Sequence, residues 1–132
     1  MAKQDLDAGL ANLYDYTKFH IGMYATVFAA SAAAAKFASP VPGFSLVCVI
    51  VAMVCFMVAG ACGGVIASHV PHMHREMVDG GVADLWTIPI GPSLASFTRP
   101  CRWWAIREHL AFWVGAFLCF LAVLWSLCGP DS

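Results

Sequence analysis

The chain has 132 residues, of which 61% are hydrophobic and 11% are charged, and its formal net charge is -1. An ordinary soluble domain carries about 25% charged residues, so this composition argues against a soluble protein and favours a small membrane protein. It also argues against a nucleic-acid partner, because such a surface needs clustered lysine and arginine without interleaved acids. We predict an all-α polytopic membrane protein of one domain, with three transmembrane helices and with membrane lipid as its surroundings.

Residues 5–18 form the first predicted element, an amphipathic helix. Leu6, Leu10, Leu13 and Thr17 follow one another at intervals of four, three and four, which places them on one helical face. No proline separates this segment from the next, so we expect one long helix to run into the membrane.

Residues 20–37 are predicted to form the first transmembrane helix, which is rich in small side chains. Gly22, Thr26, Ala30 and Ala34 recur at a spacing of four, and such rows let helices approach closely in lipid. This helix is also more polar than the other two predicted spans, so it is the one expected to line water in an oligomer. The predicted pore-lining residues are Tyr24, Thr26, Ser31 and Lys36.

Residues 44–68 carry no charge and are predicted to form the second transmembrane helix. Cys48, Cys55 and Cys62 recur every seven residues, which indicates a stripe along one face that packs against another helix. Gly60 and Gly64 have the spacing of a close approach between helices.

Residues 69–108 are predicted to be an interfacial or re-entrant connection. Within it, the apolar stretch 82–97 is interrupted by Pro89, Gly91 and Pro92, which disfavours a regular spanning helix. A fourth span over this stretch is the less favoured alternative. Glu108 is expected to lie in this surface connection, outside the membrane. The residues predicted to contact lipid headgroups are Arg99, Arg102, Trp103, Trp104 and Arg107.

Residues 109–128 are predicted to form the third transmembrane helix, which a glycine and a proline follow. With three spans, the amino-terminal segment and the long connection lie on one side and carry six of the seven basic residues. Lys36 lies alone on the other side. The positive-inside rule therefore predicts a cell-membrane protein with a cytoplasmic amino terminus and an external carboxyl terminus.

Five histidines fall on the predicted cytoplasmic side, and we interpret them as candidates for gating or ligand sensing. His69, His72 and His74 lie within six positions, so they are also candidate ligands for zinc or copper. His20, His69 and His109 lie at the ends of the three predicted spans on the same side, so helices two and three, or one and two, could present an axial haem pair at one depth as a further alternative. The full set of sensing candidates is His20, His69, His72, His74 and His109.

The sequence shows no arrangement typical of an enzyme, since it lacks a phosphate-binding loop and a zinc-protease motif. The function we predict is a homo-oligomeric ion channel or pore that is gated from the cytoplasmic side. A single chain of this length is too small to enclose a pathway. The alternative is an accessory subunit of a larger membrane complex, which holds a metal or haem. No resident cofactor is predicted for the channel.

Overall fold

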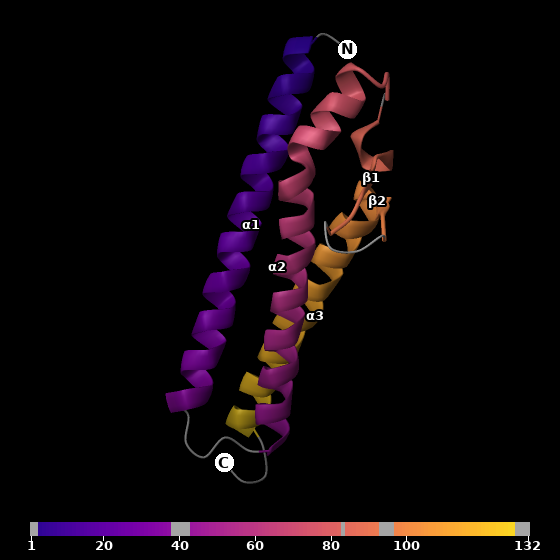
Figure 1. Ribbon diagram of the computed structural model, residues 1–132. Helices are drawn as coiled ribbons and strands as arrows, with labels where there is room; N and C mark the ends of the chain where they lie inside the picture. The colour runs from indigo at the N-terminus through magenta and orange to yellow at the C-terminus, as the bar shows by residue number, and fades with distance from the viewer. Residues whose placement is uncertain (1–2, 38–42, 83, 93–96, 129–132) are drawn as a thin grey trace.

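The computed structural model describes residues 3–37, 43–82, 84–92 and 97–128, and the side chains of residues 3–7, 34–37 and 127 fall outside that description. Three long helices lie side by side, and short elements gather at one end of them (Figure 1). The predicted all-α class is thereby confirmed over the described residues. The elements in chain order are α1 (Lys3–Phe37), α2 (Gly43–Val78), η1 (Leu85–Thr87), β1 (Pro89–Ile90), β2 (Arg99–Pro100) and α3 (Cys101–Cys128).

Helix α1 is continuous from its amphipathic part into its alanine-rich part, as the absence of proline predicts. Leu10 and Thr17 are buried and Leu13 is half-buried, so the predicted apolar face packs inward at these positions. The Thr17 hydroxyl donates to the Leu13 carbonyl at 2.8 Å, which satisfies this buried polar group within the helix. The side chain of Leu6 lies outside the described residues.

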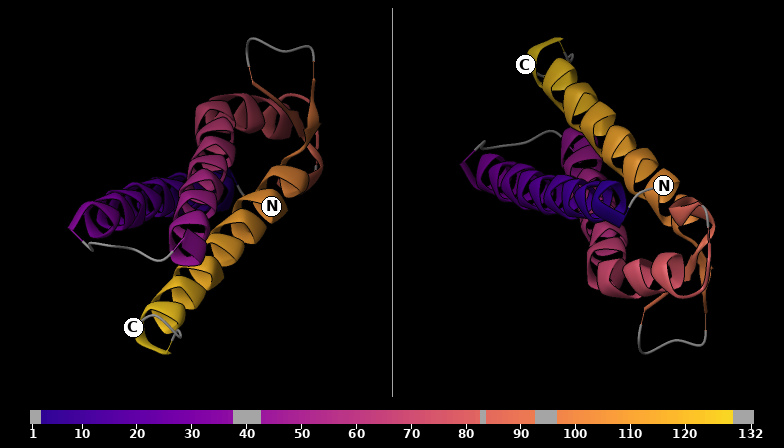
Figure 2. Two further views of the ribbon diagram at one scale, coloured as in Figure 1. Left: turned by 90° about the horizontal axis from the view of Figure 1, so that it is seen from below. Right: turned by 90° about the horizontal axis from the view of Figure 1, so that it is seen from above.

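Helix α2 ends at Val78 rather than at Ser68, so the predicted boundary is wrong. The predicted end coincides with the end of the apolar run. Apolar residues indicate which part of a helix can lie in a membrane, whereas the helix itself ends where its backbone hydrogen bonds end. Pro71 lies inside the helix, and the turns near it bend away from the preceding axis (Figure 2). Proline removes one backbone donor and crowds the preceding turn, which accounts for the bend. Gly81, with a φ of 67°, follows the end of the helix.

The connection between α2 and α3 contains a short antiparallel pair of strands. Pro89 pairs with Pro100, and Ile90 pairs with Arg99. Two further bonds attach this hairpin to α3: the Cys101 amide donates to the Ile88 carbonyl at 2.9 Å, and the Trp104 indole donates to the Ile90 carbonyl at 2.9 Å. The described part of 82–97 therefore contains no α-helix, only the three-residue 3-10 helix η1 and the strand β1, and the spanning alternative is wrong there. Residues 83 and 93–96 lie outside the described residues.

Helix α3 begins at Cys101 and not at His109, so the predicted start of the third helix is also wrong. The strand β2 ends directly before it, and the bond from the Cys101 amide to Ile88 holds its first turn. As a result, Arg102, Trp103, Trp104, Arg107 and Glu108 are helical residues.

Buried residues recur every seven positions along both α2 and α3. A seven-residue period keeps one face of a helix against its neighbour over many turns. The two helices pack tightly at Gly115, since an added Cβ there would lie 2.8 Å from Cε1 of Phe56. The repeating positions are Ser45, Ala52, Ala59, Ile66 and Met73 on α2, and Cys101, Glu108, Gly115 and Ala122 on α3.

The predicted cysteine stripe is largely buried, because Cys48 and Cys62 are buried and Cys55 is half-buried. The predicted close approach at Gly60 and Gly64 is wrong within the chain, because an added Cβ at either position would meet open space. The close approach occurs instead at the neighbouring Gly63.

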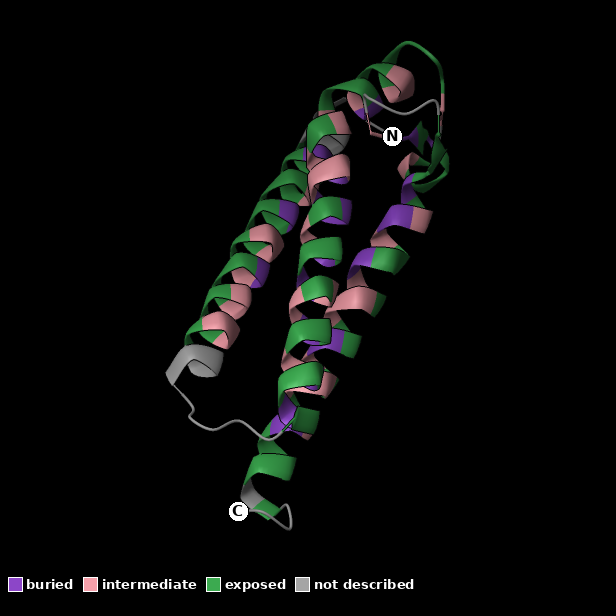
Figure 3. Ribbon diagram, turned by 60° about the horizontal axis from the view of Figure 1, so that its bottom comes forward, coloured by how far each residue is buried: buried purple, intermediate pink, exposed green. Residues whose placement is uncertain are grey.

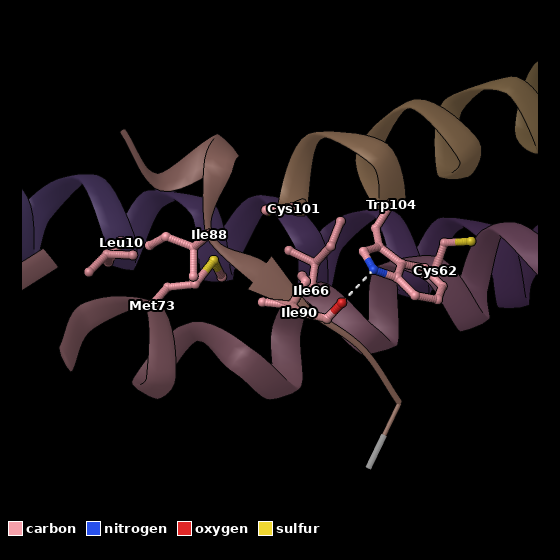
Figure 4. Close-up of a cluster of buried hydrophobic side chains, with 8 residues drawn as sticks. All are labelled: Leu10, Cys62, Ile66, Met73, Ile88, Ile90, Cys101 and Trp104. Atoms are coloured by element: carbon pink, nitrogen blue, oxygen red, sulfur yellow. Dashed lines mark hydrogen bonds between the residues drawn. The ribbon is translucent and has the colours of Figure 1, made fainter. Parts of the chain in front are cut away.

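The largest apolar core lies where the hairpin covers the ends of α2 and α3 (Figure 4). Met73, Ile88, Ile90 and Cys101 are each at most 2% exposed, so this end of the protein is well packed. The core also receives Leu10 from α1, which fixes the amino-terminal half of that helix against the other two.

Among the described residues, α2 and the segment Cys101–Ser126 of α3 are long and apolar enough to cross a membrane. Only 33% of the most apolar part of α2 and 11% of that of α3 are buried inside the protein. The central helix of a soluble protein would be mostly buried, whereas here much of each helix is exposed (Figure 3), and the exposed residues include many large apolar side chains. Examples are Ile50, Val54, Trp113, Phe117 and Phe120.

Candidate functional site

The three long helices meet around one carboxylate, that of Glu108 on α3. This acidic side chain is only 2% exposed, and it lies within the apolar segment Cys101–Ser126. A buried carboxylate in such surroundings is costly unless other groups compensate its polarity. We therefore take Glu108 and its neighbours as the candidate site.

Each of the other two long helices contributes to the surroundings of Glu108. From α1, the Tyr24 hydroxyl donates a hydrogen bond to Oε1 of Glu108 at 2.9 Å, and Tyr24 is itself only 2% exposed. From α2, Gly63 allows the backbone to come close, since an added Cβ would lie 3.3 Å from the same Oε1 and 3.2 Å from Ile21. A larger residue at position 63 would thus push α2 away from both neighbours.

Two histidines and a second tyrosine lie near Glu108 and Tyr24, toward the amino-terminal half of α1. The rings of His20 and His109 lie 5.8 Å apart, and the Tyr16 hydroxyl lies 3.0 Å from Nε2 of His109. The structure thus brings together two of the five predicted sensing histidines, one from α1 and one from α3. We call Tyr16, His20, Tyr24, Glu108 and His109 the polar cluster.

The hydrogen bonds of His109 define its neutral tautomer. Nδ1 of His109 lies 2.8 Å from the Ala105 carbonyl, which only accepts, so Nδ1 carries the proton. Nε2 of the neutral ring is then an acceptor, and the Tyr16 hydroxyl donates to it. Burial and the Glu108 carboxylate raise the pKa of Tyr16, which keeps this donor protonated. Both nitrogens of His109 are therefore already engaged.

An open cavity of about 480 Å³ lies between α1, α3 and η1 and reaches the polar cluster. Glu108, His109 and Tyr16 are among its lining residues. The remaining wall is largely apolar or small, with contributions from Gly9, Leu13 and Trp86. The carboxylate is therefore next to a space that is large enough for a small molecule.

The prediction that Glu108 lies in a surface connection is wrong, because α3 begins eight residues earlier than predicted. One signal in the sequence would have located it. Cys101, Glu108, Gly115 and Ala122 are spaced by seven residues, so the packed face of α3 continues upstream through Glu108.

The four predicted pore-lining residues do not share one face of α1. Tyr24 is buried against Glu108, and the half-buried Ser31 places its hydroxyl 3.6 Å from the sulfur of Cys119 on α3. Thr26 is exposed on the outside of α1 and bonds to the Gly22 carbonyl of its own helix. The side chain of Lys36 lies outside the described residues.

The three histidines of the predicted metal site all lie on α2, on either side of Pro71. The ring centroids of His69 and His72 are 6.3 Å apart, and Nδ1 of His69 donates to the Val65 carbonyl at 2.8 Å. Within the described part of the chain, no group of three or more histidine, cysteine or acidic residues is arranged to hold a metal ion. The metal site therefore stays a prediction from the sequence.

The predicted headgroup residues divide between the surface and the core. Arg99, Arg102 and Arg107 are exposed, and the Arg107 guanidinium lies 4.9 Å from the centre of the Trp103 ring. Trp104 is different, because it is 9% exposed and its indole bonds to Ile90 in the core. A contact between Trp104 and lipid headgroups does not fit this position.

Comparison with protein families, with curated proteins and with solved structures finds no match to this chain.

Proposed function

We propose that this chain is a multi-pass membrane protein that forms a homo-oligomeric ion channel or pore, with the polar cluster as its gate. The observation that carries the proposal is the carboxylate of Glu108, which is buried within an apolar helix and bonded to Tyr24 on another helix. An ionisable group at such a position is expensive, and it is typically retained for transport or sensing.

The proposed gate works because the polar cluster joins α1 to α3. Protonation of Glu108 changes the charge at the contact between these helices, and the hydrogen bond that Tyr24 donates to it then has to rearrange. A change in charge at this contact thus alters the relative stability of two positions of α1. That is how a local event in a channel becomes a movement of helices.

In the proposed topology α1 also spans the membrane, in addition to α2 and α3. The amino terminus lies in the cytoplasm and the carboxyl terminus outside. Glu108 follows the start of α3 by seven residues, which at 1.5 Å per residue is roughly 10 Å along the helix. The arginines of the preceding connection are the basic residues that favour the cytoplasmic side. The polar cluster would then lie near the cytoplasmic surface, where soluble signals reach it.

The proposed subunit contact is the outer face of α1. In lipid, small residues let helices of neighbouring subunits pack closely, whereas the exposed faces of α2 and α3 carry large apolar side chains that suit lipid. The exposed small residues of α1 are Gly22, Ala25, Thr26, Ala29, Ala30 and Ala33, which share one helical face.

The test of the channel is conductance of the purified protein in planar bilayers between about pH 5 and 8. We expect ion currents whose dependence on pH disappears in Glu108→Gln. The control is Asp15→Asn, which removes one acidic charge from an exposed position of α1. A wild-type protein that passes no ions under any of these conditions would disprove the proposal.

The test of the subunit contact is the mass of the protein in detergent. Ala29→Phe introduces a large ring on the small face of α1 and should shift the oligomer toward the monomer. Val54→Phe introduces the same ring on an exposed part of α2 and should leave the oligomer unchanged. A monomeric wild type would contradict this part of the proposal.

A further inference from the structure

The cavity beside the polar cluster has the features of a site for a small molecule. Its volume of about 480 Å³ lies within the range of roughly 300 to 1,000 Å³ that is usual for ligand pockets. It opens between the amino-terminal half of α1 and η1, and the Glu108 carboxylate lies in its lining. This combination of an apolar wall and one buried charge limits the chemistry of a ligand.

Glu108 is the acidic residue in the lining of the cavity, and its carboxylate has unused hydrogen-bonding capacity. Tyr24 donates to one oxygen of Glu108, while a carboxylate accepts about four hydrogen bonds. His109, the adjacent ring in the lining, already uses both nitrogens, one with Ala105 and one with Tyr16. A ligand that donates hydrogen bonds and carries a positive charge would therefore complement Glu108, and an anion would be repelled.

The other walls of the cavity suit an apolar body attached to that positive group. Leu13 and Ile66 provide aliphatic surface, and the rings of Tyr16 and Trp86 provide aromatic faces that attract cations. We infer that the cavity between α1, α3 and η1 binds a small organic ammonium ion, with the ammonium group on Glu108 and its carbon chain against Leu13 and Ile66. The inference goes beyond the proposed channel, because it holds whether or not the protein conducts ions.

The ammonium group has two natural sources, a free alkylamine and the ethanolamine headgroup of a phospholipid. Both present the same donor to Glu108, and a cavity that opens between helices near a membrane surface is accessible to either. The chemistry that they share is the primary ammonium group.

The first test is calorimetric titration of hexylammonium into the full chain in a non-ionic detergent. We expect saturable binding, and we expect it to weaken at least about tenfold in Glu108→Gln, which removes the charge but keeps the shape. The uncharged probe 1-hexanol should bind wild type at least about tenfold more weakly than hexylammonium. Asp15→Asn should leave binding unchanged, because Asp15 is an exposed residue of α1.

A second pair of variants tests the location without touching Glu108. Gly9 lines the cavity, and an added Cβ there meets open space, so Gly9→Phe should fill the cavity and abolish binding. Ala11→Phe adds the same ring at an exposed position of α1 and should have no effect. If Glu108→Gln does not fold, this pair still decides the question.

Competition distinguishes the two sources. Short-chain phosphatidylethanolamine that displaces hexylammonium, while its N-acetyl form, which lacks the ammonium charge, does not, identifies the headgroup as a ligand. No displacement by either lipid identifies the free amine. The inference is overturned if hexylammonium shows no saturable binding, if hexanol binds equally well, or if Gly9→Phe binds like wild type. These results are independent of conductance, so the site and the channel can fail separately.

Discussion

Removal of the Tyr24 hydroxyl is the most direct test of the contact that joins α1 to α3. Tyr24→Phe keeps the ring, which lies 5.2 Å from that of Phe112, and deletes only the donor to Oε1 of Glu108. The carboxylate would remain buried with one partner fewer, because Glu108 is 2% exposed and water does not easily replace the hydroxyl.

The expected loss of stability in Tyr24→Phe can be bounded by two known ranges, one for soluble proteins and a lower one for membrane helices. A hydrogen bond to a charged group contributes about 1.5–3 kcal/mol in soluble proteins. Bonds between membrane helices average about 0.6 kcal/mol and reach about 1.7 kcal/mol, because the reference state also finds partners. The burial of both Tyr24 and Glu108 favours the upper part of the membrane range, so we expect a loss of about 1–1.7 kcal/mol.

The measurement is the free energy of unfolding in mixed micelles, with a double-mutant cycle through Glu108→Leu. The single variants should each destabilise the protein, and the double variant should be more stable than the sum predicts, because neither partner is left unpaired. Tyr14→Phe makes the same chemical change at an exposed position of α1 and should have little effect. A Tyr24→Phe protein as stable as wild type, or strictly additive effects, would refute the reasoning.

Three further predictions test the packing and the polar cluster. Gly115→Ala should lower the free energy of unfolding by about 1–3 kcal/mol, because its methyl group would meet an aromatic ring of α2 at 2.8 Å. Gly64→Ala, whose methyl group meets open space, should raise the free energy of unfolding by about 0.5–1 kcal/mol. Equal effects of the two substitutions would contradict the close packing of α2 and α3 at Gly115. Ser31→Cys should form a disulfide with Cys119 on mild oxidation, seen as the loss of two free thiols, because the native oxygen and sulfur are 3.6 Å apart. The raised pKa of Tyr16 favours the folded state below pH 10.0, so this contribution to stability should be lost as the pH rises above that value. Chemical unfolding of Tyr16→Phe should show a weaker loss of stability over the same pH range. An identical pH profile for wild type and variant would contradict the raised pKa of Tyr16.

The sequence by itself determined that the chain is helical and that its apolar content exceeds what a soluble core needs. Apolar runs without charge predict long helices, and the absence of proline before residue 38 predicts the continuity of α1. These properties depend on the local chain, so they can be derived from composition and periodicity. The inward face of α1 at Leu10 and Thr17 followed from the helical period in the same way.

The ends of α2 and α3 could not be derived in this way. Apolarity ends near Ser68 and resumes near His109, but the helices extend through polar residues because backbone hydrogen bonds and packing against the hairpin sustain them. The burial of Ile88 and Ile90, which holds the hairpin on α3, depends on residues that are distant in sequence.

Only the tertiary structure decided which polar residues form the site. Tyr24 and Glu108 are separated by 84 positions, and no local pattern links a tyrosine on one helix to a carboxylate on another. The sequence supplied the two histidines and the seven-residue spacing that passes through Glu108. The approach of Ile21 on α1 and Glu108 on α3 to Gly63 on α2 required the packing of three helices, because proximity between helices depends on which faces bury one another and not on the order of residues along the chain.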